Sequence, residues 1–189
     1  MNIGLYFGSY NPIHIGHLII GSHVANHTDM QQVWFVVSPQ NPLKPSTVLL
    51  NEYHRLHLVQ LAVEGDAQLK ASDVEFKLPR PSYTIDTLTY LQEKYPQHQF
   101  SVIMGSDSFQ NLPRWKNFEL LAKNYSFIIY RRPGFEISDL YGAQVQILDA
   151  PLLEISATNI RHAIKTGQSV RYLLSDAVRE EIEKTGYYK

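Results

Sequence analysis

The 189-residue sequence predicts an α/β fold in which a doubly wound, mostly parallel sheet is followed by a small C-terminal helical portion. Short apolar runs alternate with stretches of helical spacing, which is the pattern of strand–helix units on a parallel sheet. After Pro151 this alternation stops and two helical stretches follow. The chain has no internal repeat, linker or low-complexity tract, so we expect a single domain over residues 1–189.

Six apolar runs are the expected strands. The first, second, fourth and fifth are nearly continuous, as strands covered on both faces should be. The third alternates between apolar and polar residues, which fits an edge strand. In chain order the runs are Ile3–Phe7, Val33–Ser38, Leu69–Phe76, Phe100–Gly105, Tyr125–Tyr130 and Val145–Leu148.

The stretches between and after these runs are the expected helices. Asn51 is the expected N-cap of the second, because its short polar side chain can accept a backbone N–H of the first turn. Ser175 and Asp176 should open the last helix, and Gly186 should end it. In chain order the stretches are Leu18–Ala25, Asn51–Val63, Ser82–Lys94, Phe118–Lys123, Ser156–Lys165 and Ser175–Lys184.

Composition and charge narrow the class of protein. The formal net charge is −1, so no global basic field would draw nucleic acid to the surface. The absence of cysteine excludes disulfides, thiolate catalysis and cysteine-ligated metal centres. We find neither a signal peptide nor an apolar run of the roughly 20 residues that a membrane helix needs. We therefore expect a cytoplasmic protein that binds neither nucleic acid nor a membrane.

The loop after the first strand carries the clearest chemical signal. Gly8 and Ser9 follow the strand, and His14 and His17 stand three positions apart where the next helix begins. Backbone N–H groups at a helix N-terminus bind anions, and Gly16 lets a ligand approach the backbone closely. The pattern favours a phosphate site. A capping or packing pair of histidines is one alternative, and a metal pair that needs distant carboxylates is another.

Two segments resemble the motifs of a known superfamily. His-Ile-Gly-His at 14–17 is identical to the HIGH signature of the nucleotidylyltransferases, and residues 8–13 resemble their opening loop. Ile155–Arg161 is similar to their second motif, with Ala157 in place of a hydroxyl residue. Asn11 stands where many members have aspartate. The resemblance implies a Rossmann-like nucleotidylyltransferase fold and a single nucleotidylyltransferase domain.

Further segments are similar to those of bacterial nicotinate-nucleotide adenylyltransferases. These are S-Y-T-I-D-T-L at 82–88, G-S-D at 105–107 and W-K at 115–116. That family transfers AMP from ATP to nicotinate mononucleotide, giving deamido-NAD and pyrophosphate in NAD biosynthesis. The resemblance therefore implies an enzyme, with ATP and nicotinate mononucleotide as its partners. Mg²⁺ would be carried on the ATP phosphates, and no metal would sit in a protein cage.

The resemblance also implies roles for individual residues. His17 would donate to the α-phosphate of ATP, His14 to the triphosphate, and Arg161 would bind the triphosphate tail, which makes these three the predicted catalytic residues. The predicted ATP-binding residues are Gly8, Ser9, Tyr10, His14, Gly16, His17, Gly105, Asp107, Ile155, Ser156, Thr158 and Arg161. The predicted residues for the pyridine mononucleotide are Ser9, Lys44, Tyr83, Thr84, Trp115 and Arg132.

This reaction needs no general base, because a phosphate nucleophile with a second pKa of about 6 is mostly ionised near pH 7. Catalysis would come from aligning two anions and neutralising their charge. Trp115 would stack on the cationic pyridine ring, a contact of about 0.5–2 kcal/mol. Lys44, Arg55 and Arg132 are each explained equally well as phosphate ligands or as solvated surface charges.

Several alternatives remain open. Pantetheine-phosphate adenylyltransferase shares the opening loop and HIGH, but it is not expected to carry the 82–88 and tryptophan segments. A preference for nicotinamide mononucleotide would be decided by the pocket around Thr84 and Trp115. From other classes, a non-catalytic nucleotide-binding module would keep the pocket without turnover, and a metal-dependent hydrolase would rest on the histidine pair alone. Homo-oligomerisation is left open.

Overall fold

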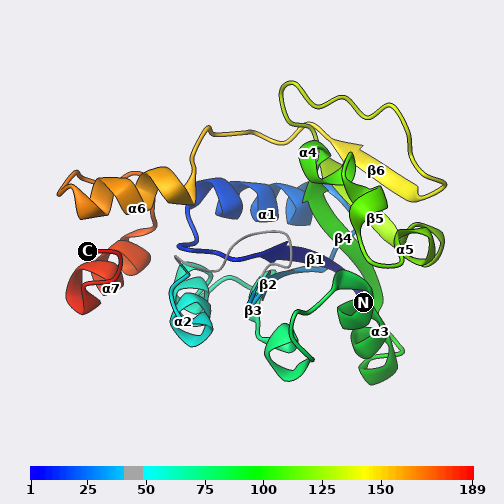
Figure 1. Cartoon of the computed structure of the whole chain (residues 1–189), viewed down its shortest axis with the longest axis horizontal. Coiled ribbons are helices and arrows are strands. Elements are labelled where there is room, and N and C mark those ends of the chain that lie inside the picture. The colour runs from blue at the N-terminus through cyan, green and yellow to red at the C-terminus, as the bar shows by residue number, and fades with distance from the viewer. Residues whose placement is uncertain (41–48) are drawn as a thin grey trace.

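The computed structural model describes residues 1–40 and 49–189. Its centre is a six-stranded sheet in the order β3-β2-β1-β4-β5-β6 (Figure 1), and every neighbouring pair of strands is parallel. The predicted α/β class and parallel sheet are confirmed. The strands are β1 (Asn2–Gly8), β2 (Gln32–Val37), β3 (Leu69–Ser72), β4 (Gln99–Gly105), β5 (Ser126–Tyr130) and β6 (Gln144–Leu148).

Seven α-helices and two short 3-10 helices connect and follow the strands within the described ranges. None of the helices there is long and apolar enough to cross a membrane. The α-helices are α1 (Ile15–His27), α2 (Glu52–Ala62), α3 (Thr84–Lys94), α4 (Ser106–Phe109), α5 (Phe118–Asn124), α6 (Ala157–Lys165) and α7 (Asp176–Thr185). The 3-10 helices are η1 (Val74–Lys77) and η2 (Leu112–Arg114).

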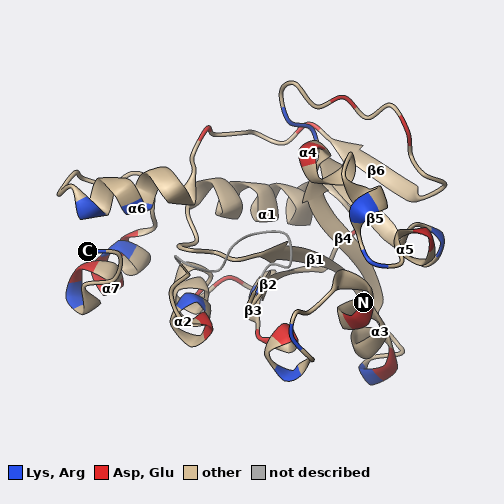
Figure 2. Cartoon of the chain, in the orientation of Figure 1, with Lys and Arg blue, Asp and Glu red and all other residues tan. Residues whose placement is uncertain are grey.

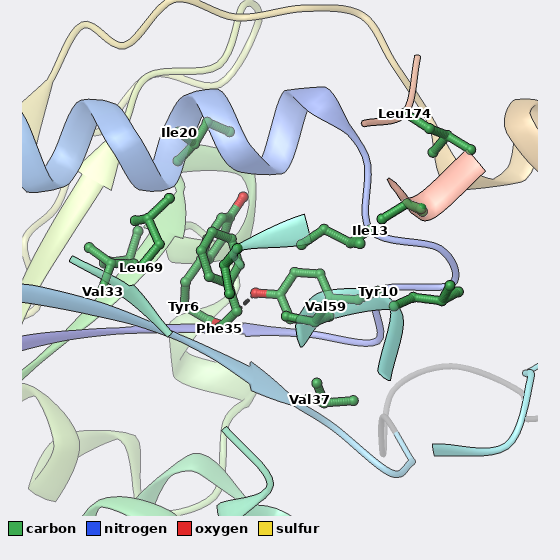
Figure 3. Packing of buried hydrophobic residues seen from close by; sticks show 14 of the residues in the cluster. Tyr6, Tyr10, Ile13, Ile20, Val33, Phe35, Val37, Val59, Leu69 and Leu174 are labelled. Atoms are coloured by element: carbon green, nitrogen blue, oxygen red, sulfur yellow. Dashed lines mark hydrogen bonds between the residues drawn. The ribbon is translucent and has the colours of Figure 1, made fainter. Parts of the chain in front are cut away.

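Helices cover both faces of the sheet, as the predicted doubly wound arrangement requires. On one face, Ile20 of α1 and Val59 of α2 belong to the buried cluster around Phe35 (Figure 3). On the other face, Leu88 of α3 and Leu121 of α5 belong to a second buried cluster. Each buried Val, Leu or Phe side chain stabilises the fold by about 1.5–3 kcal/mol, which explains the continuous apolar runs of the central strands.

The third expected strand is shorter than the sequence indicated. β3 ends at Ser72, and the chain then turns into η1, which buries Val74 and Glu75. β3 does lie at an edge of the sheet, as expected. The predicted cap of α2 is confirmed, since the side chain of Asn51 accepts the N–H of Tyr53. The short helix α4 was not predicted.

The C-terminal helical portion packs against the start of α1. The N–H of Ile15 donates to the carbonyl of Leu173 across 3.0 Å, which holds the end of the opening loop against the segment between α6 and α7. Ser156 caps α6 by accepting the N–H of Asn159. Gly186 ends α7 with a left-handed φ of 73°, as predicted. Figure 1 shows α6 and α7 at the end of the molecule where α1 begins.

Candidate active site

Many of the predicted site residues gather at the carboxyl ends of the central strands. Gly8 ends β1 and Gly105 ends β4, and these strands are neighbours where the strand order reverses. Open α/β sheets bind ligands in the crevice outside this point. A cavity of about 230 Å³ opens here, and its lining includes Gly8, Glu75, Tyr83, Thr84, Gly105 and Trp115. The structure therefore brings together four segments that the sequence singled out separately: the opening loop, 82–88, 105–107 and 115–116.

The two histidines of the opening motif stack on each other. Their ring centroids are 3.7 Å apart and their planes differ by 22°. The backbone N–H of His14 donates to Nδ1 of His17 across 3.3 Å, so a neutral His17 carries its proton on Nε2. The rings of Tyr6 and Tyr10 pack edge-on around His17, with centroids 6.2 and 5.1 Å away. The surrounding rings therefore set the position of the His17 side chain. The hydrogen bond at Nδ1 sets its tautomer and leaves Nε2–H as the donor.

Both histidines are neutral near pH 7. Burial, helped by the positive charge of Arg132, lowers the pKa of His14 to about 4. Burial also lowers the pKa of His17 well below its ordinary value, with smaller contributions from His14 and Arg132. Nδ1 of His14 is buried without a hydrogen-bond partner in the described part of the chain. Neutral imidazoles act on an anion as N–H donors, and a bound phosphate would favour their charged forms.

The second motif reaches the opening loop from the start of α6. Nη1 of Arg161 donates to the carbonyl of Asn11 across 2.7 Å, and Nη2 donates to Oγ1 of Thr158 across 3.2 Å. A Cβ placed on Gly16 would lie 3.9 Å from Cβ of Ile155, so the motif also lies beside the start of α1. Figure 2 shows that α1 has no Lys, Arg, Asp or Glu. A positively charged Lys or Arg side chain near its N-terminus must therefore come from another element, as Arg161 does from α6.

Asp107 and Arg132 pair with each other at the carboxyl ends of β4 and β5. Nε of Arg132 lies 3.4 Å from Oδ1 of Asp107, and the two side chains are 47% and 33% exposed. A Cβ on Gly105 would collide with Oδ1 of Asp107 and lie 3.1 Å from Nε of Arg132, so a larger residue here would have to displace the pair. A half-exposed pair of this kind contributes about 0–1 kcal/mol, and it could therefore open to a ligand at little cost.

Arg55, whose role the sequence left open, is fully buried and binds the backbone. Nε donates to the carbonyl of Leu50 across 2.8 Å and Nη2 to that of Pro39 across 3.0 Å. Nη1 donates to the carbonyls of Ser9 and Ser38. The guanidinium therefore ties the loop after β1 to the loop after β2 and to the start of α2. Its donors face carbonyl groups and are not directed at a ligand.

Two residues of the opening loop are buried in ways the sequence did not indicate. The ring of Tyr10 lies in the core, and its hydroxyl donates to the carbonyl of Tyr6 (Figure 3), so a nucleotide could contact its backbone only. Oδ1 of Asn11 accepts the N–H of Leu50 across 3.2 Å. An amide oxygen is sufficient for this contact, so the contact itself does not require aspartate. The predicted residue Lys44 lies outside the described residues.

Glu75 is a cavity residue that the sequence analysis missed. Its carboxylate is 2% exposed and accepts hydrogen bonds from Oγ of Ser82 across 2.9 Å and from Oγ1 of Thr87 across 3.0 Å. These two hydroxyl residues flank Tyr83 and Thr84, which the sequence predicted to bind the pyridine mononucleotide. The hydroxyl residues were visible in the sequence, but nothing local indicated which acceptor they would find.

Comparisons with known proteins agree with this geometry. A cytidylyltransferase-like family model matches residues 5–163. A "Probable nicotinate-nucleotide adenylyltransferase" of Cytophaga hutchinsonii is 50% identical over 189 residues, which cover 100% of this chain and 98% of the relative. A relative of the same name from Flavobacterium johnsoniae is 47% identical over 192 aligned positions, which cover 100% of both chains.

A solved structure extends the comparison to three dimensions. The nicotinic acid mononucleotide adenylyltransferase of Plasmodium falciparum, complexed with NaAD, superposes with a TM-score of 0.83. The match covers 99% of this chain and 97% of the other at 21% identity. At that identity the likeness shows the fold alone, and the expected Rossmann-like nucleotidylyltransferase architecture is confirmed.

Proposed function

We propose that this chain, which belongs to the nicotinate-nucleotide adenylyltransferase family, transfers AMP from ATP to nicotinate mononucleotide in NAD biosynthesis. The products are deamido-NAD and pyrophosphate. Membership rests on relatives 47% and 50% identical over the whole chain. The observation that carries the activity is the contact of Arg161 with Asn11, because it joins both superfamily motifs at one end of the sheet. We also propose that the chain acts as a single domain in the cytoplasm, without nucleic-acid or membrane partners.

The cavity at the ends of β1 and β4 suits the pyridine mononucleotide. Trp115 is half-buried in its wall and Tyr83 lines it as well, so aromatic faces are available to the cationic pyridine ring. Thr84 is the first residue of α3, and the free N–H groups of that helix start favour a carboxylate. We therefore assign the nicotinate ring to this cavity and its phosphate to the loop at Gly8 and Ser9.

ATP would lie across the start of α1 and the start of α6. His14 and His17 offer N–H donors at the first helix, and Arg161 adds a positive charge from the second. Ser156 and Thr158 lie near Arg161 at the start of α6, and their hydroxyls contact the N–H of Asn159 and the guanidinium, respectively. The predicted contacts of Gly16, Gly105, Asp107 and Ile155 with ATP belong to this proposal.

The chemical step is an in-line displacement at phosphorus. An oxygen of the mononucleotide phosphate forms a bond to the α-phosphorus of ATP, and the bond from that phosphorus to the oxygen bridging to the β-phosphate breaks. Pyrophosphate leaves with the electron pair, and no proton has to be removed from the nucleophile. Nε2–H of His17 would donate to a non-bridging α-phosphate oxygen, while Arg161 would bind the departing pyrophosphate.

Magnesium would enter as part of the MgATP substrate. Among residues 1–40 and 49–189, no group of three or more His, Asp or Glu side chains could hold a metal ion. Mg²⁺ usually keeps several waters and binds through substrate phosphates, so such a group is not required. We propose that the ATP phosphates carry the ion and that it neutralises charge on the leaving pyrophosphate.

The test compares three acceptor substrates. Purified protein is given MgATP with nicotinate mononucleotide, nicotinamide mononucleotide or 4′-phosphopantetheine, and pyrophosphate release is followed. We expect the fastest release with nicotinate mononucleotide and none with 4′-phosphopantetheine. If 4′-phosphopantetheine were the single acceptor that gave pyrophosphate release, the protein would be a pantetheine-phosphate adenylyltransferase. No release with any acceptor would favour the non-catalytic nucleotide-binding module.

A further inference from the structure

We propose that Glu75 is a positioning residue for the pyridine substrate, because its hydrogen bonds to Ser82 and Thr87 hold Tyr83 and Thr84 in place at the cavity wall. This inference rests on the proposed function, since it concerns the substrate assigned to that cavity. It adds a residue that lies outside both superfamily motifs and outside the segments that resemble the adenylyltransferase family.

The carboxylate acts as a clamp that joins Ser82, which precedes α3, to Thr87 within α3. Oε2 of Glu75 accepts from Oγ of Ser82 across 2.9 Å, and Oε1 accepts from Oγ1 of Thr87 across 3.0 Å. Both hydroxyl residues are buried, at 7% and 0% exposure. Tyr83 and Thr84 stand between them in the sequence, and both line the cavity. The segment that would contact the pyridine ring is therefore held on both sides by one side chain.

The start of α3 lacks a side-chain cap. Its N-cap residue is Tyr83, whose side chain makes no capping hydrogen bond, although Ser, Thr, Asp or Asn is usual at this position. Oγ1 of Thr87 also lies 3.3 Å from the carbonyl of Tyr83, so the hydroxyl that binds Glu75 also touches the backbone just before Thr84. Glu75 thus supplies from η1 the anchoring that a cap would supply from the helix itself.

Stability alone is a poor reason for a carboxylate in this place. Burial raises the pKa of Glu75. The hydrogen bonds from Ser38, Ser82 and Thr87 favour the ionised form and offset only part of this rise. A buried charge is costly unless it is fully hydrogen-bonded, and none of the described Lys or Arg residues forms an ion pair with it. Defining the position of neighbouring groups is the advantage that offsets this cost.

The contacts of Glu75 lie on the side of the site that we assign to the pyridine substrate. Tyr83 is held on its other side by Lys116, whose Nζ lies 4.7 Å from the ring centroid and 2.8 Å from Oδ2 of Asp86. Lys116 follows Trp115, so the clamp and this contact together connect η1, α3 and the tryptophan segment. The groups proposed for the ATP phosphates, His14, His17 and Arg161, lie instead at the start of α1 and on α6. Loosening the clamp should therefore affect the pyridine substrate and leave ATP largely unaffected.

The experiment uses Thr87 because its hydroxyl can be removed without changing its shape. Thr87→Val removes one of the hydrogen bonds to Glu75, and Thr87→Ser keeps it. Thr89→Val is the matched control, since Thr89 is exposed on the same helix and its hydroxyl donates to the carbonyl of Ile85. For each protein, KM is measured separately for nicotinate mononucleotide and for ATP, together with kcat and the melting temperature.

We expect Thr87→Val to raise KM for nicotinate mononucleotide about tenfold, the usual effect of losing one hydrogen bond to a charged group. KM for ATP and kcat should stay within about twofold of the wild type, since neither depends on that hydrogen bond. Thr87→Ser and Thr89→Val should resemble the wild type. Ser82→Ala should repeat the effect of Thr87→Val through the other oxygen of Glu75.

Two results would overturn the positioning role. One is an equal rise of both KM values in Thr87→Val, and the other is a lower melting temperature with both KM values unchanged. Either would mean that Glu75 only supports the fold. A wild-type protein that releases no pyrophosphate with nicotinate mononucleotide would instead overturn the proposed function. Because none of these readouts requires a Glu75 variant, the test holds even if Glu75→Ala does not fold.

Discussion

The guanidinium of Arg161 donates a hydrogen bond to the backbone carbonyl of Asn11 across 2.7 Å, although 150 positions separate the two residues. The side chain of Asn11 in turn accepts the N–H of Leu50 at the start of α2. The opening loop is therefore braced from α2 and from α6 at the same residue. Through this contact Arg161 is directed at the loop that leads into the start of α1, where we place the triphosphate.

Removing this arginine should weaken ATP binding most. Arg161→Met is expected to lower kcat/KM for ATP by about 10- to 100-fold, because hydrogen bonds to charged groups are worth about 1.5–3 kcal/mol. Arg161→Lys should recover part of the loss by keeping the charge. Arg171→Met is the control, since Arg171 is an exposed residue beyond α6. Equal activities of the Arg161 and Arg171 variants in steady-state assays would contradict the assignment.

His17 should affect turnover more than binding. His17→Ala is expected to lower kcat by ~10²–10³, the effect of removing one donor to the transition state. His23→Ala provides the comparison, because His23 lies on the same helix and stacks on His27 away from the site. Single-turnover rates with saturating MgATP measure the step directly. A near-wild-type rate for His17→Ala would exclude it as the donor to the α-phosphate.

Trp115 should affect the pyridine substrate selectively. Loss of a cation–π contact worth about 0.5–2 kcal/mol predicts that Trp115→Ala raises KM for nicotinate mononucleotide by about 2- to 30-fold. Trp115→Phe should retain much of the interaction, since it keeps an aromatic face. KM for ATP serves as the internal reference in the same assays. The stacking role fails if the KM for ATP rises while that for the pyridine substrate does not.

The free energy of unfolding should decrease as the pH falls from about 6.5 towards about 4. His14 stays neutral in the folded chain because its pKa is lowered to about 4, whereas an unfolded histidine binds a proton near pH 6.5. Between these pH values the unfolded state binds one more proton than the folded state, so lowering the pH favours unfolding. Over the whole range, His14 alone lowers the free energy of unfolding by about 3 kcal/mol. His17 acts in the same direction.

Urea unfolding at pH 7 and pH 4.5 tests this dependence on His14. His14→Gln should lose less stability between the two pH values than the wild type, because the substituted side chain does not titrate. His27→Gln is a control, since His27 is exposed at the end of α1. Identical losses in wild type and His14→Gln would show that His14 is not the group responsible.

Removing magnesium should abolish adenylyl transfer. The triphosphate needs a counterion for its leaving group, and the described residues offer no protein cluster that would retain the metal against a chelator. Activity should disappear on adding EDTA and return in full with excess Mg²⁺. Undiminished pyrophosphate release in the chelator would contradict a metal carried on the nucleotide.

Most of the fold and much of the candidate site were predictable from local patterns. Strands end at Gly8 and Gly105, Asn51 caps α2 and Gly186 ends α7, as expected. Each of these features depends on a few neighbouring residues. The end of β3 was not predictable. Two apolar and two charged residues at 73–76 suit a strand as well as a 3-10 helix, and the contacts of Glu75 decide between them.

The sequence by itself determined the α/β class, the parallel sheet, the family and the two motifs, because periodicity, caps and motif spacing are properties of neighbouring positions. Only the tertiary structure decided that Arg161 meets Asn11, that Arg55 is buried among carbonyl groups, and that Glu75 holds the wall of the cavity. The physical reason is that these contacts depend on how the crossover connections bring distant segments to one edge of the sheet. Which donor finds which acceptor there is settled by burial, since a polar group removed from water must find a partner.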